Sequence, residues 1–235
     1  LPNDLVLVDI NPGGQGQDWR TQKTLTVKRK EMQRPDIVSW QFKDSVQKNE
    51  AYEMYSYIPD ITYKGLRSTG VQYNNYISDH YLHLPESLPN RVKQLANSIT
   101  DGMEHPVDKA LAIETFLRDE GSFIYSQDIK SPPSDGDSVD WFLFDTKTGY
   151  SDYFASAMTV MMRSVGVPSR MAVGYASGEL IDEDYRSIKD SDSHGWVQVY
   201  FPDYGWIDFE PTPKWDKLDR SFDRKGMLGV GEPTL

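Results

Sequence analysis

Four side chains in the second half of the chain have residue types and positions suited to acyl-transfer chemistry. Ser151 precedes a mostly apolar run and therefore stands at the expected start of a helix. His194 lies at the start of an expected strand, and Asp208 and Glu210 lie two residues apart on the next strand, so that both carboxylates face the same side. If the two strands pair, one carboxylate can reach His194, and a hydroxyl, an imidazole and a carboxylate become available for nucleophilic catalysis.

Each of these residues also has a structural explanation that involves no chemistry. Serine is a favoured helix N-cap and Asp152 suits the first helical turn, so Ser151 can be a cap alone. His194 can be a hydrogen-bonded histidine at the edge of a sheet. A serine hydrolase of the G-x-S-x-G type fits poorly, because Tyr153 replaces the second glycine. A helix start favours a thiolate, whereas a serine hydroxyl stays protonated unless a base removes its proton.

The composition excludes several classes of partner and site. The 25 basic and 36 acidic residues give a formal net charge of 25 − 36 = −11, and an acidic surface repels nucleic-acid phosphates. The absence of cysteine excludes disulfides and thiolate metal sites. A calcium-regulated domain would rest on acidic loops alone, and Gly136 is misplaced for an EF-hand loop. We therefore expect no nucleic-acid partner, no metal and no cofactor.

The pattern along the chain changes at a proline-punctuated stretch, residues 83–89. Before it, short alternating or β-branched runs predict the strands of a small antiparallel unit, at residues 4–10, 24–30, 36–42 and 52–58. Two prolines interrupt hydrogen bonding within the stretch itself. We expect the domain boundary there, with a β-rich accessory domain over residues 1–82.

Beyond this boundary the spacing of apolar residues predicts both helices and strands. Helical spacing predicts helices at residues 92–99, 106–121 and 151 to about 165. Strand signals occur at residues 170–175, 195–201 and 205–211, and a turn between the last two predicts a hairpin. We expect a polar connection over residues 178–193 and a flexible tail over residues 216–235. No apolar run approaches the roughly 20 residues that span a bilayer.

Three motifs resemble the core of bacterial transglutaminase-like proteins, which are papain-like relatives of the animal transglutaminases. They are "VDWFLFDTKTGY", "GYSDYFASAMTVMMRSVGVPSRMAVGYASGE" and "DSDSHGWVQVYFPDYGWIDFEPTP". The resemblance covers residues 84 to 213 and implies an α+β fold, with a helix-borne nucleophile position packed on an antiparallel sheet. It implies a transglutaminase-like catalytic domain over residues 83–215, after the small β-rich domain.

The resemblance also assigns roles to residues. In that family the helix begins with Gly-Tyr-Cys and the cysteine is the nucleophile, the histidine of H-x-W is the base, and the acid of F-[DE]-P-T orients it. Ser151 occupies the cysteine position, His194 matches the base and Glu210 matches the orienting acid. The candidates for oxyanion stabilisation and for the substrate cleft are Trp141, Tyr150, Asp152, Trp196 and Asp208.

Ser151 departs from the family pattern at the reacting atom. We expect the parent activity, thiol-type acyl transfer at carboxamides with water or an amine as acceptor, to be silenced in this chain. The alternative is a non-catalytic module that binds peptide or cell-wall amides. The serine is either a deliberate Cys→Ser change, which the otherwise complete motif set favours, or a natural variant.

The resemblance implies a partner and a location as well. The partner would be a carboxamide of a peptide or protein, with cell-wall peptide among the candidates. Close relatives are extracytoplasmic domains of multi-pass membrane proteins. We therefore expect this chain to be a soluble piece of a membrane-anchored protein, located at the extracytoplasmic face of the membrane.

Overall fold

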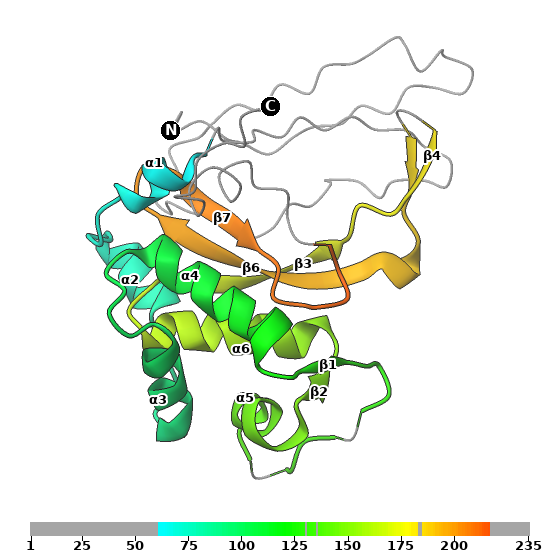
Figure 1. Cartoon of the computed structure of the whole chain (residues 1–235), viewed down its shortest axis with the longest axis horizontal. Coiled ribbons are helices and arrows are strands. Elements are labelled where there is room, and N and C mark those ends of the chain that lie inside the picture. The colour runs from blue at the N-terminus through cyan, green and yellow to red at the C-terminus, as the bar shows by residue number, and fades with distance from the viewer. Residues whose placement is uncertain (1–60, 130, 135, 183–184, 217–235) are drawn as a thin grey trace, which may run out of the picture. The chain divides into compact units, whose positions relative to one another are not determined.

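A computed structural model describes residues 61–129, 131–134, 136–182 and 185–216 of the chain (Figure 1). These residues belong to a compact unit that begins at Ile61. The strands expected between residues 4 and 58, and the expected tail from residue 217 onward, lie outside the described residues.

The segment before the proposed boundary is helical where the structure describes it. Residues 61–82 contain the helices α1 (Tyr63–Arg67) and α2 (Asn75–Tyr81), and the β-rich assignment is wrong for this segment. Side chains cap both helices, because Thr62 accepts the N–H of Gly65 and Asn74 accepts the N–H of Ile77. Both helices are too short for the helical spacing of apolar residues to be recognised in the sequence.

The central sheet has three antiparallel strands in the order β3-β6-β7. They are β3 (Ser169–Tyr175), β6 (Ser193–Phe201) and β7 (Gly205–Phe209), which confirms the three predicted strands. β6 and β7 form the predicted hairpin, with Phe201 opposite Gly205. On β6 the residues Gly195, Val197, Val199 and Phe201 alternate with less buried ones, so one face of the strand enters the core.

Helix α6 (Ser151–Ser164) packs against β3 and β6, as predicted for the segment from residue 151 (Figure 1). Its buried side chains follow helical spacing and include Phe154, Met158, Met161 and Met162. Gly166 then adopts a φ of +77°, in the left-handed region that favours glycine after a helix.

Two further predicted helices cover α6. They are α3 (Asn90–Ile99) and α4 (Pro106–Thr115), which begins with Pro106 as expected. A π-helical turn, η1 (Phe116–Glu120), continues α4 as far as Gly121. The described residues therefore form an α+β unit in which α6 lies between the sheet and these helices.

Short elements complete the unit. The parallel pair β1 (Ile124–Tyr125) and β2 (Thr148–Gly149) lies near the start of α6, with α5 (Ser138–Trp141) and the π-helical turn η2 (Phe142–Thr146) between them in sequence. The expected polar connection at 178–193 instead contains the hairpin of β4 (Glu179–Asp182) and β5 (Tyr185–Ser187), followed by the 3₁₀ turn η3 (Asp190–Asp192).

Candidate active site

Ser151 is the first residue of α6 and does not cap it. The N-cap position belongs to Tyr150, whose side chain makes no capping bond, so the expectation of a serine cap is wrong. Ser151 is only 7% exposed. Its Oγ accepts the backbone N–H of Gly195 at 3.3 Å and lies 3.4 Å from Oδ1 of Asp152. The hydroxyl therefore points at β6 rather than back along its own helix.

The close approach of β6 to Ser151 depends on a glycine. A Cβ atom at Gly195 would lie 2.8 Å from Cε of Met171 and 3.1 Å from Oδ1 of Asp152. Any larger residue would have to displace these side chains or the strand. Glycine at this position therefore lets the backbone next to His194 come within hydrogen-bond distance of the nucleophile position.

His194 and Glu210 form a buried pair on the sheet. Nε2 of His194 lies 2.5 Å from Oε2 of Glu210, and the two residues are 7% and 4% exposed. A carboxylate acceptor places the ring proton on Nε2 and leaves Nδ1 as the basic nitrogen. Nδ1 is buried and has no hydrogen-bond partner among the described residues. The pair therefore presents an oriented imidazole with one unused nitrogen.

Asp208, the other candidate acid, lies elsewhere. It is exposed on β7 and accepts a hydrogen bond from Nε2 of Gln198 at 2.8 Å. β7 ends at Phe209, so the alternation of side chains between the two faces of the strand no longer applies to Glu210. Its side chain is buried in the core. The preference for Glu210 as the hydrogen-bond partner of His194 is confirmed, while the expectation that both carboxylates face one side fails at the end of the strand.

Two residues that the sequence analysis missed hold Glu210 in place. Glu114 of α4 accepts the N–H of Glu210 at 2.7 Å. Arg118, one helical turn further on, donates to the carbonyls of Glu210, Thr212 and Trp215, each at 2.8 Å. In the sequence, Glu114 and Arg118 are marked by their spacing, because they are an acid and a base four residues apart among apolar neighbours. Their partners lie more than ninety residues away, which sequence spacing does not reveal.

Tryptophans enclose the imidazole. The ring of Trp215 lies 4.5 Å from that of His194, and the ring of Trp196 lies 6.2 Å away. Trp196 was expected near the site, whereas Trp215 was not. Arg118 donates to the backbone carbonyls of both Glu210 and Trp215. The same side chain therefore positions the acid and one of the two tryptophans beside His194.

The remaining candidates are Trp141, the last residue of α5, and Tyr150 and Asp152 at the start of α6. Trp141 and Tyr150 both pack on Tyr153, with ring centroids 6.3 Å and 5.1 Å from it. Burial raises the pKa of Tyr153, and the neighbouring Tyr150 and Asp152 raise it further. The first N–H groups of a helix have no intrahelical acceptor, so those of Ser151 and Asp152 are the donors available to an oxyanion.

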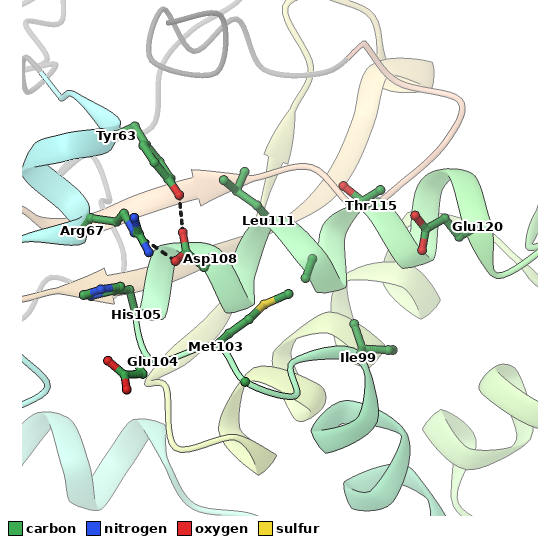
Figure 2. A pocket seen from close by; sticks show the side chains of 12 residues that line it. Tyr63, Arg67, Ile99, Met103, Glu104, His105, Asp108, Leu111, Thr115 and Glu120 are labelled. Carbon is green, nitrogen blue, oxygen red and sulfur yellow. Dashed lines mark hydrogen bonds and ion pairs between the residues drawn. The ribbon is translucent and has the colours of Figure 1, made fainter. Parts of the chain in front are cut away.

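A pocket of about 660 Å³ lies away from these residues, between α1, α3, α4 and η1 (Figure 2). Tyr63 Oη and Arg67 Nε point into it and donate to the carboxylate of Asp108, at 2.5 Å and 3.0 Å. Neither Ser151 nor His194 lines it. Because its carboxylate is already bonded, we assign no ligand to this pocket.

The described residues hold neither a candidate metal site nor a candidate membrane-spanning helix. No cluster of three or more histidine, cysteine, aspartate or glutamate side chains there could hold a metal ion. None of the helices in the same residues has the length and apolar character needed to span a bilayer.

Comparison with known proteins identifies the family. The sequence model of the transglutaminase-like superfamily matches residues 93–211. The uncharacterized protein YebA of Bacillus subtilis is 42% identical over 140 residues, which are 57% of this chain and 19% of that protein. A protein-glutamine gamma-glutamyltransferase of Pseudomonas aeruginosa is 33% identical over 132 residues, 56% of this chain and 19% of that protein.

A solved structure agrees with the sequence comparison. The crystal structure of the periplasmic domain of TgpA from Pseudomonas aeruginosa matches with 31% identity and a TM-score of 0.51, over 60% of this chain and 48% of that one. The chain spans about a fifth of the length of the curated relatives that it matches. With half of its length matched by the family model, this chain belongs to the transglutaminase-like superfamily.

Proposed function

We propose that this domain has the site of a thiol-type acyltransferase acting on peptide or protein carboxamides, and that Ser151 in the nucleophile position silences it. The observation that carries the proposal is the buried His194–Glu210 pair, in which Nδ1 of His194 has no partner among the described residues, together with the contact of the next residue, Gly195, with Ser151. A buried imidazole oriented by a carboxylate beside a helix start is the arrangement that activates a thiol.

With a cysteine at position 151, each step can be assigned to residues of this chain. The thiolate attacks the carboxamide carbon, a C–S bond forms, and the carbonyl oxygen becomes an oxyanion that the N–H groups at the start of α6 can bind. The C–N bond then breaks, and the departing nitrogen takes a proton from the His194 imidazolium and leaves as ammonia. Water or an amine next attacks the thioester and gives a proton to His194, and the C–S bond breaks to restore the thiolate.

A serine fails at the first of these steps. Its hydroxyl is far less acidic than a thiol, so the helix start and the imidazole hold no alkoxide before substrate arrives. The contact of Ser151 Oγ with Oδ1 of Asp152 works in the same direction, because it engages the hydroxyl proton with a carboxylate. We therefore expect the protein to bind an amide substrate and to turn it over very slowly.

The names of two relatives support a more specific substrate and location for this proposal. One relative is named as acting on protein glutamine, so we propose the glutamine side chain as the acyl donor. Another is a periplasmic domain, so we propose an extracytoplasmic location as part of a longer, membrane-anchored protein. An accessory role for the segment before Ile61, where the compact unit begins, stays part of this proposal.

The test is ammonia release from a glutamine-containing peptide by the Ser151→Cys variant. We expect release that depends on the peptide and is abolished by the further change His194→Ala. A second candidate function, a binding module without chemistry, is favoured by the serine itself. It predicts that the cysteine variant binds the peptide with unchanged affinity, measured by calorimetry, and releases no ammonia.

A further inference from the structure

Strand β3 forms one edge of the central sheet, because it pairs with β6 alone among the described strands. Residues of antiparallel strands alternate between those that exchange hydrogen bonds with the partner strand and those that do not. The N–H of Ala176 donates to the carbonyl of Asp192 at 2.8 Å, so the even-numbered residues of β3 exchange hydrogen bonds with β6. The N–H and C=O groups of the alternate residues Met171, Val173 and Tyr175 therefore point away from β6.

The start of this outer edge is occupied, and the rest of it is open. Nε and Nη2 of Arg163 donate to the carbonyl of Ser169 at 3.0 Å and 2.8 Å. From Met171 onward, no described residue bonds to the outward backbone groups. Proteins commonly block such an edge with a charge, a proline or a bulge, because unpaired edge groups are a template for another strand. Residues 171–175 contain no charge and no proline, and their register with β6 has no shift.

Apolar groups lie beside the open edge on both faces of the sheet. On one face, Val173 is 75% exposed and Tyr175 is 57% exposed, which are high values for side chains of a central sheet. On the other face, a Cβ at Gly174 would lie 3.0 Å from the far end of the Trp196 ring, so this ring extends over β3. The same ring lies 6.2 Å from that of His194. A strand added to β3 would therefore find apolar contacts on both faces, close to the candidate active site.

The segment that joins β3 to β6 is acidic. In the sequence, residues 176–192 contain two bases and six acids, a net charge of 2 − 6 = −4. One acid, Glu179, is paired with Lys189 at 3.1 Å. Asp190 is exposed and forms no salt bridge with a cation of the described residues. Charge complementarity across an interface selects the partner of opposite sign, so the surroundings of this edge favour a cationic partner.

We propose that the outer edge of β3 binds an extended, cationic polypeptide segment as an additional antiparallel strand. The outward N–H and C=O groups alternate along β3 with the repeat of a polypeptide backbone, and this repeat specifies a peptide as the partner. Alternate apolar side chains of that peptide would pack on Val173 and Tyr175, because directly opposed residues of antiparallel strands face the same side. Binding at this edge is separate from the chemistry at position 151, while a role in recruiting a protein substrate rests on the function proposed above.

The first test uses the chain with Ser151 and a short, fluorescent peptide in which valine alternates with lysine. When the valines lie opposite Val173 and Tyr175 in antiparallel pairing, their N–H groups face β3 and the lysine N–H groups face solvent. N-methylation of the valine amides should therefore weaken binding at least about tenfold in fluorescence anisotropy, relative to N-methylation of an equal number of lysine amides. The two peptides match in charge and in methyl groups, so equal affinities would overturn the proposal.

A second pair of measurements locates the bound peptide and uses no folded variant. In hydrogen exchange, the unmethylated peptide should slow exchange of the N–H groups of Met171, Val173 and Tyr175 more than that of Gly174, which already bonds to β6. Protection confined to other strands or helices would contradict the assignment. Without peptide, analytical ultracentrifugation should show a monomer. A dimer that the peptide dissociates would assign this edge to a second copy of the chain and overturn the proposal. Both results are independent of ammonia release by the Ser151→Cys variant, so either proposal can fail alone.

Discussion

Arg118 should be the residue whose loss most affects both the stability and the site of this domain. Its guanidinium makes three hydrogen bonds of 2.8 Å to the carbonyls of Glu210, Thr212 and Trp215. Each hydrogen bond from a charged donor contributes about 1.5–3 kcal/mol to the free energy of unfolding. The three together would contribute about 5–9 kcal/mol if their contributions were fully additive, which makes this sum an upper bound. One side chain makes all of them, and its removal also relieves the cost of partial burial. We therefore expect Arg118→Met to lower the free energy of unfolding by about 2–4 kcal/mol.

The assay is equilibrium unfolding in urea, followed by tryptophan fluorescence. Arg67→Met is the matched control, because its ion pair with Asp108 is exposed and should contribute at most about 1 kcal/mol. In the Ser151→Cys background, Arg118→Met should also slow alkylation of the thiol, since Glu210 and Trp215 would no longer hold His194. A loss of stability no larger than that of the control, together with an unchanged alkylation rate, would refute the positioning role of Arg118.

Three further substitutions test separate parts of the structure. Gly195→Ala should cost at most about 1 kcal/mol in urea unfolding, because the new methyl group would meet only the ends of the Met171 and Asp152 side chains, which can move, and it should weaken the contact between β6 and position 151. Met158→Ala, at a fully buried position of α6, should cost about 2–5 kcal/mol in the same assay, and a loss below about 1 kcal/mol would mean that this core is loosely packed. Glu210→Gln should leave the fold intact by circular dichroism, yet slow thiol alkylation in the Ser151→Cys background by weakening the hydrogen bond that orients His194.

The elements with strong apolar periodicity were predictable from the sequence. α6 and the hairpin of β6 and β7 each bury one face over many residues, so their patterns are long enough to identify. The hairpin of β4 and β5 was missed because exposed polar side chains dominate its segment, and only backbone pairing marks it. α1 and α2 were missed because each places a single buried residue, Leu66 or Ile77, in a short helix.

The site could be predicted only in part. Resemblance located Ser151, His194 and Glu210, but strand alternation alone left Asp208 as an equal choice. Which of the two acids reaches His194 depends on β7 ending at Phe209. Sequence patterns do not place the end of a strand to within one residue. The same one-residue uncertainty made Ser151 an expected cap when it is the first residue of its helix. Glu114 and Arg118 reach the site through contacts that only the folded chain creates.

The most direct test of the central claim is the pH dependence of iodoacetamide alkylation in the Ser151→Cys variant. The chain has no other cysteine, so the reaction reports on this one thiol. A free thiol has a pKa of about 8.5, and a helix start with a nearby imidazolium lowers it to roughly 3.5–7.5. The account predicts an inflection below about 7.5 that returns toward 8.5 when His194 is replaced by alanine. An inflection near 8.5 in both variants would contradict the assignment of position 151 and His194 as a nucleophile–base pair.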